Sequence, residues 1–286
     1  MSEPSLRFAA RSHIGKVRRN NEDSGYASSQ LLVVADGMGG HEAGELASAA
    51  TIGAVVSALG DGFEVDTALG LLSDAVITSG EYIADVVARN REFAGMGTTM
   101  TALALCNEQV AIAHVGDSRA YLLRDGELQQ LTKDHTFVQS LVDAGEITRE
   151  QAAVHPRRNL MMRAIDGIHA VDVDLSVREA RVGDRLLLCS DGLCGVLGDD
   201  EIAAALATPD IVNAVSRLID ETLDAGAPDN ITVVVADIID GTDVADAVVL
   251  GAAAESDTHA RLPGVNLPEE PQLAVAEPAL DFVQPR

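Results

Sequence analysis

Three aspartates stand at the ends of apolar segments that look like buried strands. Asp36 follows the run LLVVA, Asp191 follows LLLCS, and Asp229 comes directly before NITVVVAD. If these strand ends meet, three carboxylates share one site, and because like charges repel, they ionise together only around a cation. Hard carboxylate oxygens select Mg²⁺ or Mn²⁺ over softer metals. The pattern therefore predicts either a divalent metal site or three separate acids that lie far apart.

Glycine follows two of these aspartates. Gly37 and Gly192 lack a Cβ, so the backbone there can turn a carbonyl oxygen toward a bound ion. Asp-Gly is also a common turn dipeptide, so a purely structural interpretation stays open for each pair taken singly.

Two further polar segments carry candidate site residues. GKVRRNNEDSG brings Arg18, Glu22 and Asp23 close together in the sequence. A guanidinium fork matches the geometry of a phosphate group, although a surface loop held by ion pairs is the alternative. Asp117 stands at another strand end and is a further candidate ligand, whereas Asp125 before glycine indicates a tight hairpin turn.

The segments that position these residues are short apolar runs bounded by turn residues, which is typical of strands. We expect strands over residues 30–36, 100–106, 109–116, 119–124, 184–190 and 230–239. The three strands from 100 to 124 are joined by connections too short for a helical crossover. We therefore expect them to form an antiparallel meander.

Helical periodicity lies elsewhere in the chain. We expect helices at 44–59, near 65–92, near 137–153 and at 210–226. Runs such as LLVVA and TVVVA are apolar at successive positions, so both faces of each sheet must be covered. This predicts an α+β fold, a four-layer α-β-β-α sandwich with two central, mainly antiparallel β-sheets flanked by helices.

Composition limits the classes of partner and compartment. The chain has 286 residues, 47% of them hydrophobic, and a formal net charge of −25, which excludes nucleic acid and anionic lipid as partners. It has no long apolar stretch and no signal-peptide pattern, so we expect a soluble protein without membrane insertion or export. An odd number of cysteines without a C-x-x-C spacing indicates a reducing, cytoplasmic location. Residues 241–286 are rich in Ala, Pro and acids and are predicted to be a disordered tail.

Seven segments, in this order, resemble the motifs of one known family: RRNNED, ADGMGGH, GMGTTMTAL, VGDSRAYLLRDG, LTKDHTFVQ, CSDGL and APDNITVVV. The family is that of the metal-dependent serine/threonine protein phosphatases of type 2C, in its bacterial form. The resemblance implies a catalytic domain over residues 6–240, with a mobile flap at about 136–165 beside the active site.

The same resemblance implies a centre of two Mn²⁺ or Mg²⁺ ions in a channel between the sheets. Asp36 would bridge the two ions, the carbonyl of Gly37 would bind one, and Asp191 and Asp229 would complete the protein ligands. Asp117 matches the position that helps bind a third ion in bacterial relatives.

The resemblance also assigns residues to the substrate and to water. Arg18 would hold the substrate phosphate, and Glu22 and Asp23 would contact metal-bound water. Eukaryotic relatives place a histidine directly after the Asp-Gly pair, whereas this chain has Met38 there. His41 is a candidate general acid, and a histidine that only makes hydrogen bonds at a helix start is the alternative.

These assignments imply direct hydrolysis of phosphoserine and phosphothreonine monoesters by a metal-activated water, with no covalent phosphoenzyme. Neither cysteine segment carries the arginine of a C-x5-R phosphate-binding loop. The expected partners are phosphorylated proteins, including serine/threonine kinases, and we expect a monomer. Two alternatives are a catalytically weak relative that binds phosphoproteins as a regulator, and a phosphatase of sigma-factor regulators, which would usually carry attached sensory modules.

Overall fold

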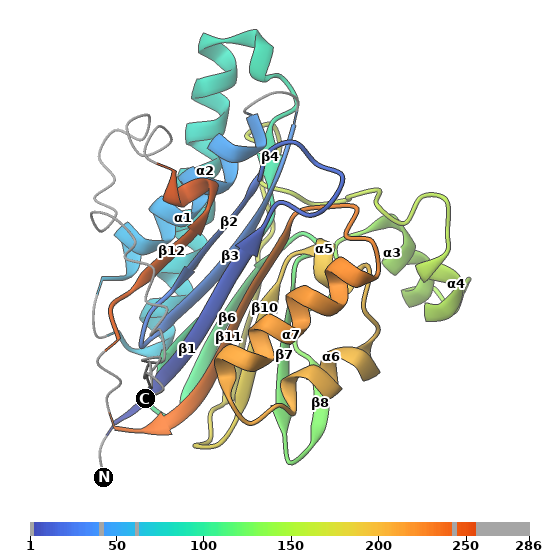
Figure 1. Cartoon of the computed structure of the whole chain (residues 1–286). Coiled ribbons are helices and arrows are strands. Elements are labelled where there is room, and N and C mark those ends of the chain that lie inside the picture. The colour runs from blue at the N-terminus through green and yellow to red at the C-terminus, as the bar shows by residue number, and fades with distance from the viewer. Residues whose placement is uncertain (1–2, 40–42, 61–62, 242–244, 256–286) are drawn as a thin grey trace, which may run out of the picture.

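In the computed structural model, two antiparallel β-sheets pack face to face, and a layer of helices covers the outer face of each (Figure 1). The structure describes residues 3–39, 43–60, 63–241 and 245–255. The predicted α+β class and its α-β-β-α layering are confirmed.

The first sheet combines the N-terminal strand with two strands from the middle of the chain and two from its later part. Its strands run in the order β1 (Pro4–His13), β11 (Ile231–Asp240), β10 (Arg185–Cys189), β7 (Arg119–Arg124) and β8 (Glu127–Gln130). Its outer face is covered by α5 (Asp191–Cys194), α6 (Asp199–Leu206) and α7 (Ile211–Asp224).

The second sheet is built mainly from the first half of the chain. Its strands run in the order β12 (Val248–Gly251), β2 (Asp23–Ala27), β3 (Leu31–Met38), β5 (Met100–Cys106), β6 (Gln109–Val115) and β9 (Asp174–Glu179). The short β4 (Gly97–Thr98) pairs with the end of β3. Helices α1 (Ala43–Leu59) and α2 (Val65–Arg89), followed by the 3₁₀ turn η1 (Arg91–Phe93), cover the outer face.

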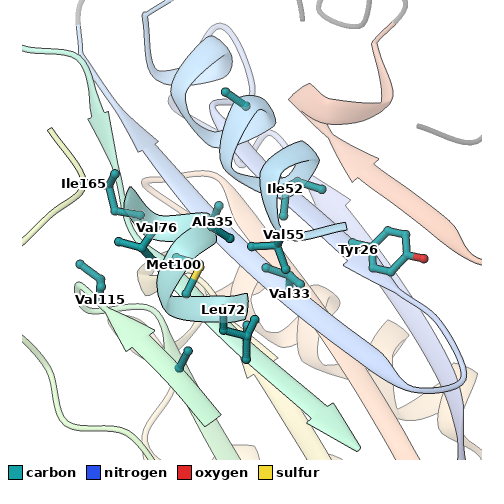
Figure 2. Packing of buried hydrophobic residues seen from close by; sticks show 14 of the residues in the cluster. Tyr26, Val33, Ala35, Ile52, Val55, Leu72, Val76, Met100, Val115 and Ile165 are labelled. Carbon is teal, nitrogen blue, oxygen red and sulfur yellow. The ribbon is translucent and has the colours of Figure 1, made fainter. Parts of the chain in front are cut away.

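Successive residues of the central strands face opposite sides of their sheet, which explains the unbroken apolar runs. In β3, Leu32 and Val34 pack between the two sheets, whereas Val33 and Ala35 pack under α1 and α2. Figure 2 shows the second group, with Val33 and Ala35 beside Ile52, Val55, Leu72 and Val76 of the covering helices. Asp36 is the next residue on the face that points between the sheets.

The predicted meander over 100–124 is wrong for its third strand. β5 and β6 form an antiparallel hairpin, but β7 belongs to the other sheet. The connection of residues 116–118 passes from one sheet to the other, and Gly116 takes the left-handed φ of 111° that this sharp change of direction requires. A short connection rules out a helical crossover, but it does not rule out a change of sheet.

The predicted disordered tail from residue 241 is wrong for residues 248–254. These residues form β12, which pairs with β2, and the 3₁₀ turn η2 (Ala252–Ala254). Val249, Ala252 and Ala253 are buried, so this segment covers an apolar sheet edge that would otherwise meet water. Residues 242–244 and 256–286 of the predicted tail lie outside the described residues.

The segment that follows β8 projects from the sandwich (Figure 1). It contains α3 (Phe137–Asp143) and α4 (Arg149–Ala153), where a single helical stretch near 137–153 was predicted. Thr136 and Thr148 cap the two helices, so the second begins at its own N-cap rather than continuing the first. In the described part of the chain, no helix has the length and apolar character that crossing a membrane requires.

Candidate metal centre

The sandwich brings the predicted acidic residues to one end of the two sheets. Asp36 lies near the end of β3, and Asp191 begins α5 directly after β10. Asp229 stands just before β11, which pairs with β10, and Asp117 lies in the crossing from β6 to β7. Asp23 begins β2 directly opposite Asp36, so the two side chains share the face between the sheets.

The electrostatics of these carboxyl groups indicate a shared site. Burial, followed by the negative charges of Asp23, Asp191, Asp117 and Asp229, raises the pKa of Asp36 well above its usual value. Burial and the charge of Asp191 do the same to the pKa of Asp117. Burial and the charge of Asp229 raise the pKa of Asp191. A set of acids that oppose one another's ionisation so strongly suits a bound cation, which would offset their charge.

The donor chemistry of the cluster fits a hard divalent ion, with part of the coordination left to other groups. Within the described ranges, no three Asp, Glu, His or Cys side chains converge closely enough to enclose an ion by themselves. The oxygens of Asp36, Asp191 and Asp229, together with the Gly37 carbonyl, are the ligand types that Mg²⁺ and Mn²⁺ prefer, and Mg²⁺ usually keeps several waters. The set therefore fits a metal that stays partly hydrated.

Arg18 reaches the cluster from the loop between β1 and β2. Its Nη2 donates to Asp229 Oδ2 at 2.7 Å, and its side chain is 47% exposed. The guanidinium thus lies at the solvent side of the carboxylates, where it neutralises part of their charge. The structure therefore places Arg18 beside Asp229, and its contact with a substrate phosphate stays a prediction.

Glu22 and Asp23 are buried and held by side chains that the sequence interpretation missed. Asn230 Oδ1 accepts from the Glu22 backbone N–H at 2.8 Å, and Ser190 Oγ donates to Asp23 Oδ2 at 2.7 Å. Burial raises the pKa of Glu22, and burial is also the main cause that raises the pKa of Asp23 to about 7. Each missed residue is next to a predicted ligand, Asn230 after Asp229 and Ser190 before Asp191, and this adjacency was the available signal.

Two threonines of the GMGTTM segment fix the backbone of the central aspartate. Thr99 Oγ1 accepts from the Asp36 N–H and Thr98 Oγ1 donates to the Asp36 carbonyl, both at 2.9 Å. These bonds fix the Asp36 backbone without using its carboxylate.

Gly37 is required by close packing at this point of the fold. A Cβ on Gly37 would lie 2.1 Å from the Gly44 carbonyl oxygen and 2.5 Å from that of Glu22. Met38 ends β3 and pairs with Gly97. The candidate general acid, His41, lies outside the described residues.

A hollow of about 830 Å³ lies at the opposite end of the second sheet, around the turn from Cys106 to Gln109. The candidate residues do not line it.

A family model described as protein phosphatase 2C matches residues 11–232. The chain belongs to the protein phosphatase 2C family. The crystal structure of the Mycobacterium tuberculosis serine/threonine phosphatase PstP/Ppp is 51% identical, with a TM-score of 0.78, over 82% of this chain and 99% of that one. The protein phosphatase 2C fold predicted from the sequence is therefore confirmed.

Two further matches also carry the name PstP. The catalytic domain of PstP in complex with two manganese ions is 49% identical, with a TM-score of 0.77, over 83% of this chain and all of that one. The full Mycobacterium tuberculosis PstP is 49% identical over 90% of this chain. This protein phosphatase 2C chain spans about half the length of that curated relative.

Proposed function

We propose that the chain is a metal-dependent protein phosphatase that hydrolyses phosphoserine and phosphothreonine monoesters. The observation that carries this proposal is the cluster of mutually repelling carboxyl groups at one end of the sandwich, with the Arg18 guanidinium at its solvent side. Membership of the protein phosphatase 2C family and the two manganese ions of a relative's catalytic domain support the same function.

We assign the metal ligands to residues at the strand ends. Asp36, Asp191, Asp229 and the carbonyl of Gly37 would hold two Mn²⁺ or Mg²⁺ ions, and Asp117 would contribute to a third. When bound, a pair of such ions lowers the pKa of a shared water molecule and so supplies hydroxide near neutral pH.

The residues around the metal site have separate tasks. Arg18 presents a guanidinium that stays charged at any physiological pH, so it can leave Asp229 and bind two phosphate oxygens at once. That interaction offsets the charge that develops on the phosphoryl oxygens. Glu22 and Asp23, fixed by Asn230 and Ser190, present carboxylate oxygens that accept hydrogen bonds from water and so orient it toward phosphorus.

A catalytically weak relative that only binds phosphoproteins would be expected to have lost part of the acid set. Here the three aspartates at the strand ends are all present, and Asp36 is held on both its backbone groups. These features support a catalyst over a binding module.

The substrates would be phosphorylated serine and threonine side chains of proteins, including those of serine/threonine kinases. The net charge of −25 argues against nucleic acid as a partner. Cys106, Cys189 and Cys194 are free thiols, which supports a reducing, cytoplasmic compartment. We propose a monomer as the working form.

Phosphate release from a phosphothreonine peptide and from p-nitrophenyl phosphate tests the proposal. Turnover should require Mn²⁺ or Mg²⁺ and stop with EDTA, and Asp229→Asn should lower kcat by at least about 100-fold, the cost typical of losing a group that stabilises a transition state. Asp220→Asn, on the exposed side of α7, is the matched control and should leave turnover unchanged. Turnover that persists in EDTA, or a folded Asp229→Asn variant with full activity, would contradict the mechanism.

A further inference from the structure

His135 lies at the start of the flap and bonds to the residue just before Asp117. Its backbone N–H donates to the Gly116 carbonyl at 2.7 Å, and its Nδ1 accepts from the Gly116 N–H at 3.0 Å. Both backbone hydrogen-bonding groups of Gly116 are thus taken by one residue that is 19 positions further along the chain.

The other side of Asp117 is held by Thr99, which lies between β4 and β5, and by Thr101 of β5. Thr99 Oγ1 and Ser118 Oγ are 2.9 Å apart, and Thr101 Oγ1 donates to the Ser118 carbonyl at 3.0 Å. Gly116 itself packs on Thr99, because a Cβ there would lie 2.5 Å from Thr99 Cγ2. Asp117 therefore sits between two anchors, the Thr99 network on one side and His135 on the other.

The hydrogen bonds of His135 determine where its proton lies. An N–H group must donate, so the Gly116 amide requires an unprotonated Nδ1. The proton is then on Nε2, which lies 3.1 Å from Asp174 Oδ2 and donates to it. The Gly116 amide by itself requires this tautomer, and Asp174 accepts the hydrogen bond that the tautomer offers at Nε2.

Asp174 connects this histidine to the far end of the flap. Arg163 Nη1 donates to Asp174 Oδ1 at 2.8 Å, and the Met162 N–H donates to the His135 carbonyl at 2.7 Å. Both ends of the flap thus meet at His135, and the same side chain reaches the loop that carries Asp117.

We propose that His135 is a positioning residue whose Nδ1 holds Asp117 in the carboxylate cluster and whose Nε2, through Asp174, holds the flap ends together. The proposal rests on the proposed function in so far as Asp117 serves a metal ion. It assigns the two ring nitrogens to two separable tasks, so substitutions that replace one nitrogen at a time can test it.

His135→Asn places an amide oxygen near the position of Nδ1 but does not reach Asp174. His135→Gln reaches Asp174 but leaves the Gly116 amide without its acceptor. His169→Gln, at an exposed histidine that pairs with Asp166, is the control.

The first measurement is hydrogen exchange of the Gly116 amide in EDTA. We expect His135→Gln to speed this exchange roughly tenfold, the effect of losing one hydrogen bond, and His135→Asn to stay within about twofold of wild type.

The second measurement is tryptic cleavage after the exposed Arg157 and Arg158 of the flap. Cleavage should accelerate several-fold in His135→Asn and remain at the wild-type rate in His135→Gln. The third is Mn²⁺ titration by calorimetry, in which only His135→Gln should weaken the lowest-affinity site, by about tenfold.

Equal effects of the two variants on Gly116 exchange and on cleavage would show a merely structural role and overturn the proposal. A wild-type Mn²⁺ titration for His135→Gln would also overturn it. If neither variant folds, Asp174→Ala on the half-exposed β9 edge should accelerate cleavage while Gly116 exchange changes by less than about twofold, and an unchanged cleavage rate would overturn the proposal. Should these results appear in a protein without metal-dependent turnover, the assignment of His135 would stand and the proposed function would fall.

Discussion

Replacing Asp23 by asparagine should stabilise the metal-free protein at high pH. Asp23 is buried opposite Asp36. Burial is the main cause that raises its pKa from 3.8 to about 7, with a contribution from the charges of Asp191 and Asp229, against the hydrogen bonds from Ser190 and Thr232. Between these two pH values the unfolded chain releases a proton that the folded chain keeps. Folding stability therefore falls as pH rises from about 4 to about 7 and stays low above that range.

The size of the effect follows from the same shift. Raising the pKa of Asp23 from 3.8 to about 7 lowers the free energy of unfolding above pH 7 by about 4 kcal/mol. Asparagine removes this cost but keeps an oxygen that can accept from Ser190 Oγ, which bonds Asp23 at 2.7 Å. For a chain of this size, 4 kcal/mol corresponds to a rise in Tm of roughly 10 °C.

Thermal and urea unfolding in EDTA, from pH 4 to pH 8, measures the effect. We expect wild type and Asp23→Asn to be similar at pH 4 and to diverge toward pH 8, with the variant more stable. Asp220→Asn should show no pH-dependent difference from wild type. The electrostatic reasoning is refuted if Asp23→Asn is less stable than wild type at pH 8 in EDTA, or if the difference is the same at both ends of the range.

Two further changes probe the phosphate contact and the C-terminal segment. Arg18→Ala should lower kcat/KM for p-nitrophenyl phosphate roughly 10- to 100-fold, because a charge-assisted hydrogen bond contributes about 1.5 to 3 kcal/mol; Arg18→Lys should lose less, and full activity of Arg18→Ala would exclude a phosphate contact. Ending the chain after Asp240 should lower the free energy of unfolding by about 3 kcal/mol, because Val249, Ala252 and Ala253 lose their burial. Ending it after Glu255 should have little effect, and equal urea midpoints for the two truncated chains would contradict this account of β12.

The sequence predicted the central acids because their positions follow from strand geometry. Apolar runs with two buried faces predict central strands, and polar residues mark the ends of such strands. Asp36, Asp191 and Asp229 mark the ends of three of them, at the same end of the two sheets. The strands that carry them were predicted to within two residues of their observed bounds.

The sequence could not predict the features that depend on contacts between distant segments. The passage of the chain from one sheet to the other depends on the backbone conformation of Gly116, which no hydrophobic pattern records. Asn230, Ser190 and Thr99 look like ordinary polar residues until the fold places them against Glu22, Asp23 and Asp36. β12 escaped prediction because its four residues lie within a segment of tail-like composition.

The central claim is that the acids at this end of the two sheets bind divalent metal ions and that these ions are required for phosphate release. Its most direct test measures Mn²⁺ binding by calorimetry and hydrolysis of a phosphothreonine peptide, side by side, for wild type and Asp36→Ala. The account predicts at least two bound Mn²⁺ ions and Mn²⁺-dependent turnover for wild type, as described for two manganese ions in a relative's catalytic domain, and loss of both in a folded Asp36→Ala protein. A folded Asp36→Ala protein that binds Mn²⁺ and releases phosphate as wild type does would contradict it.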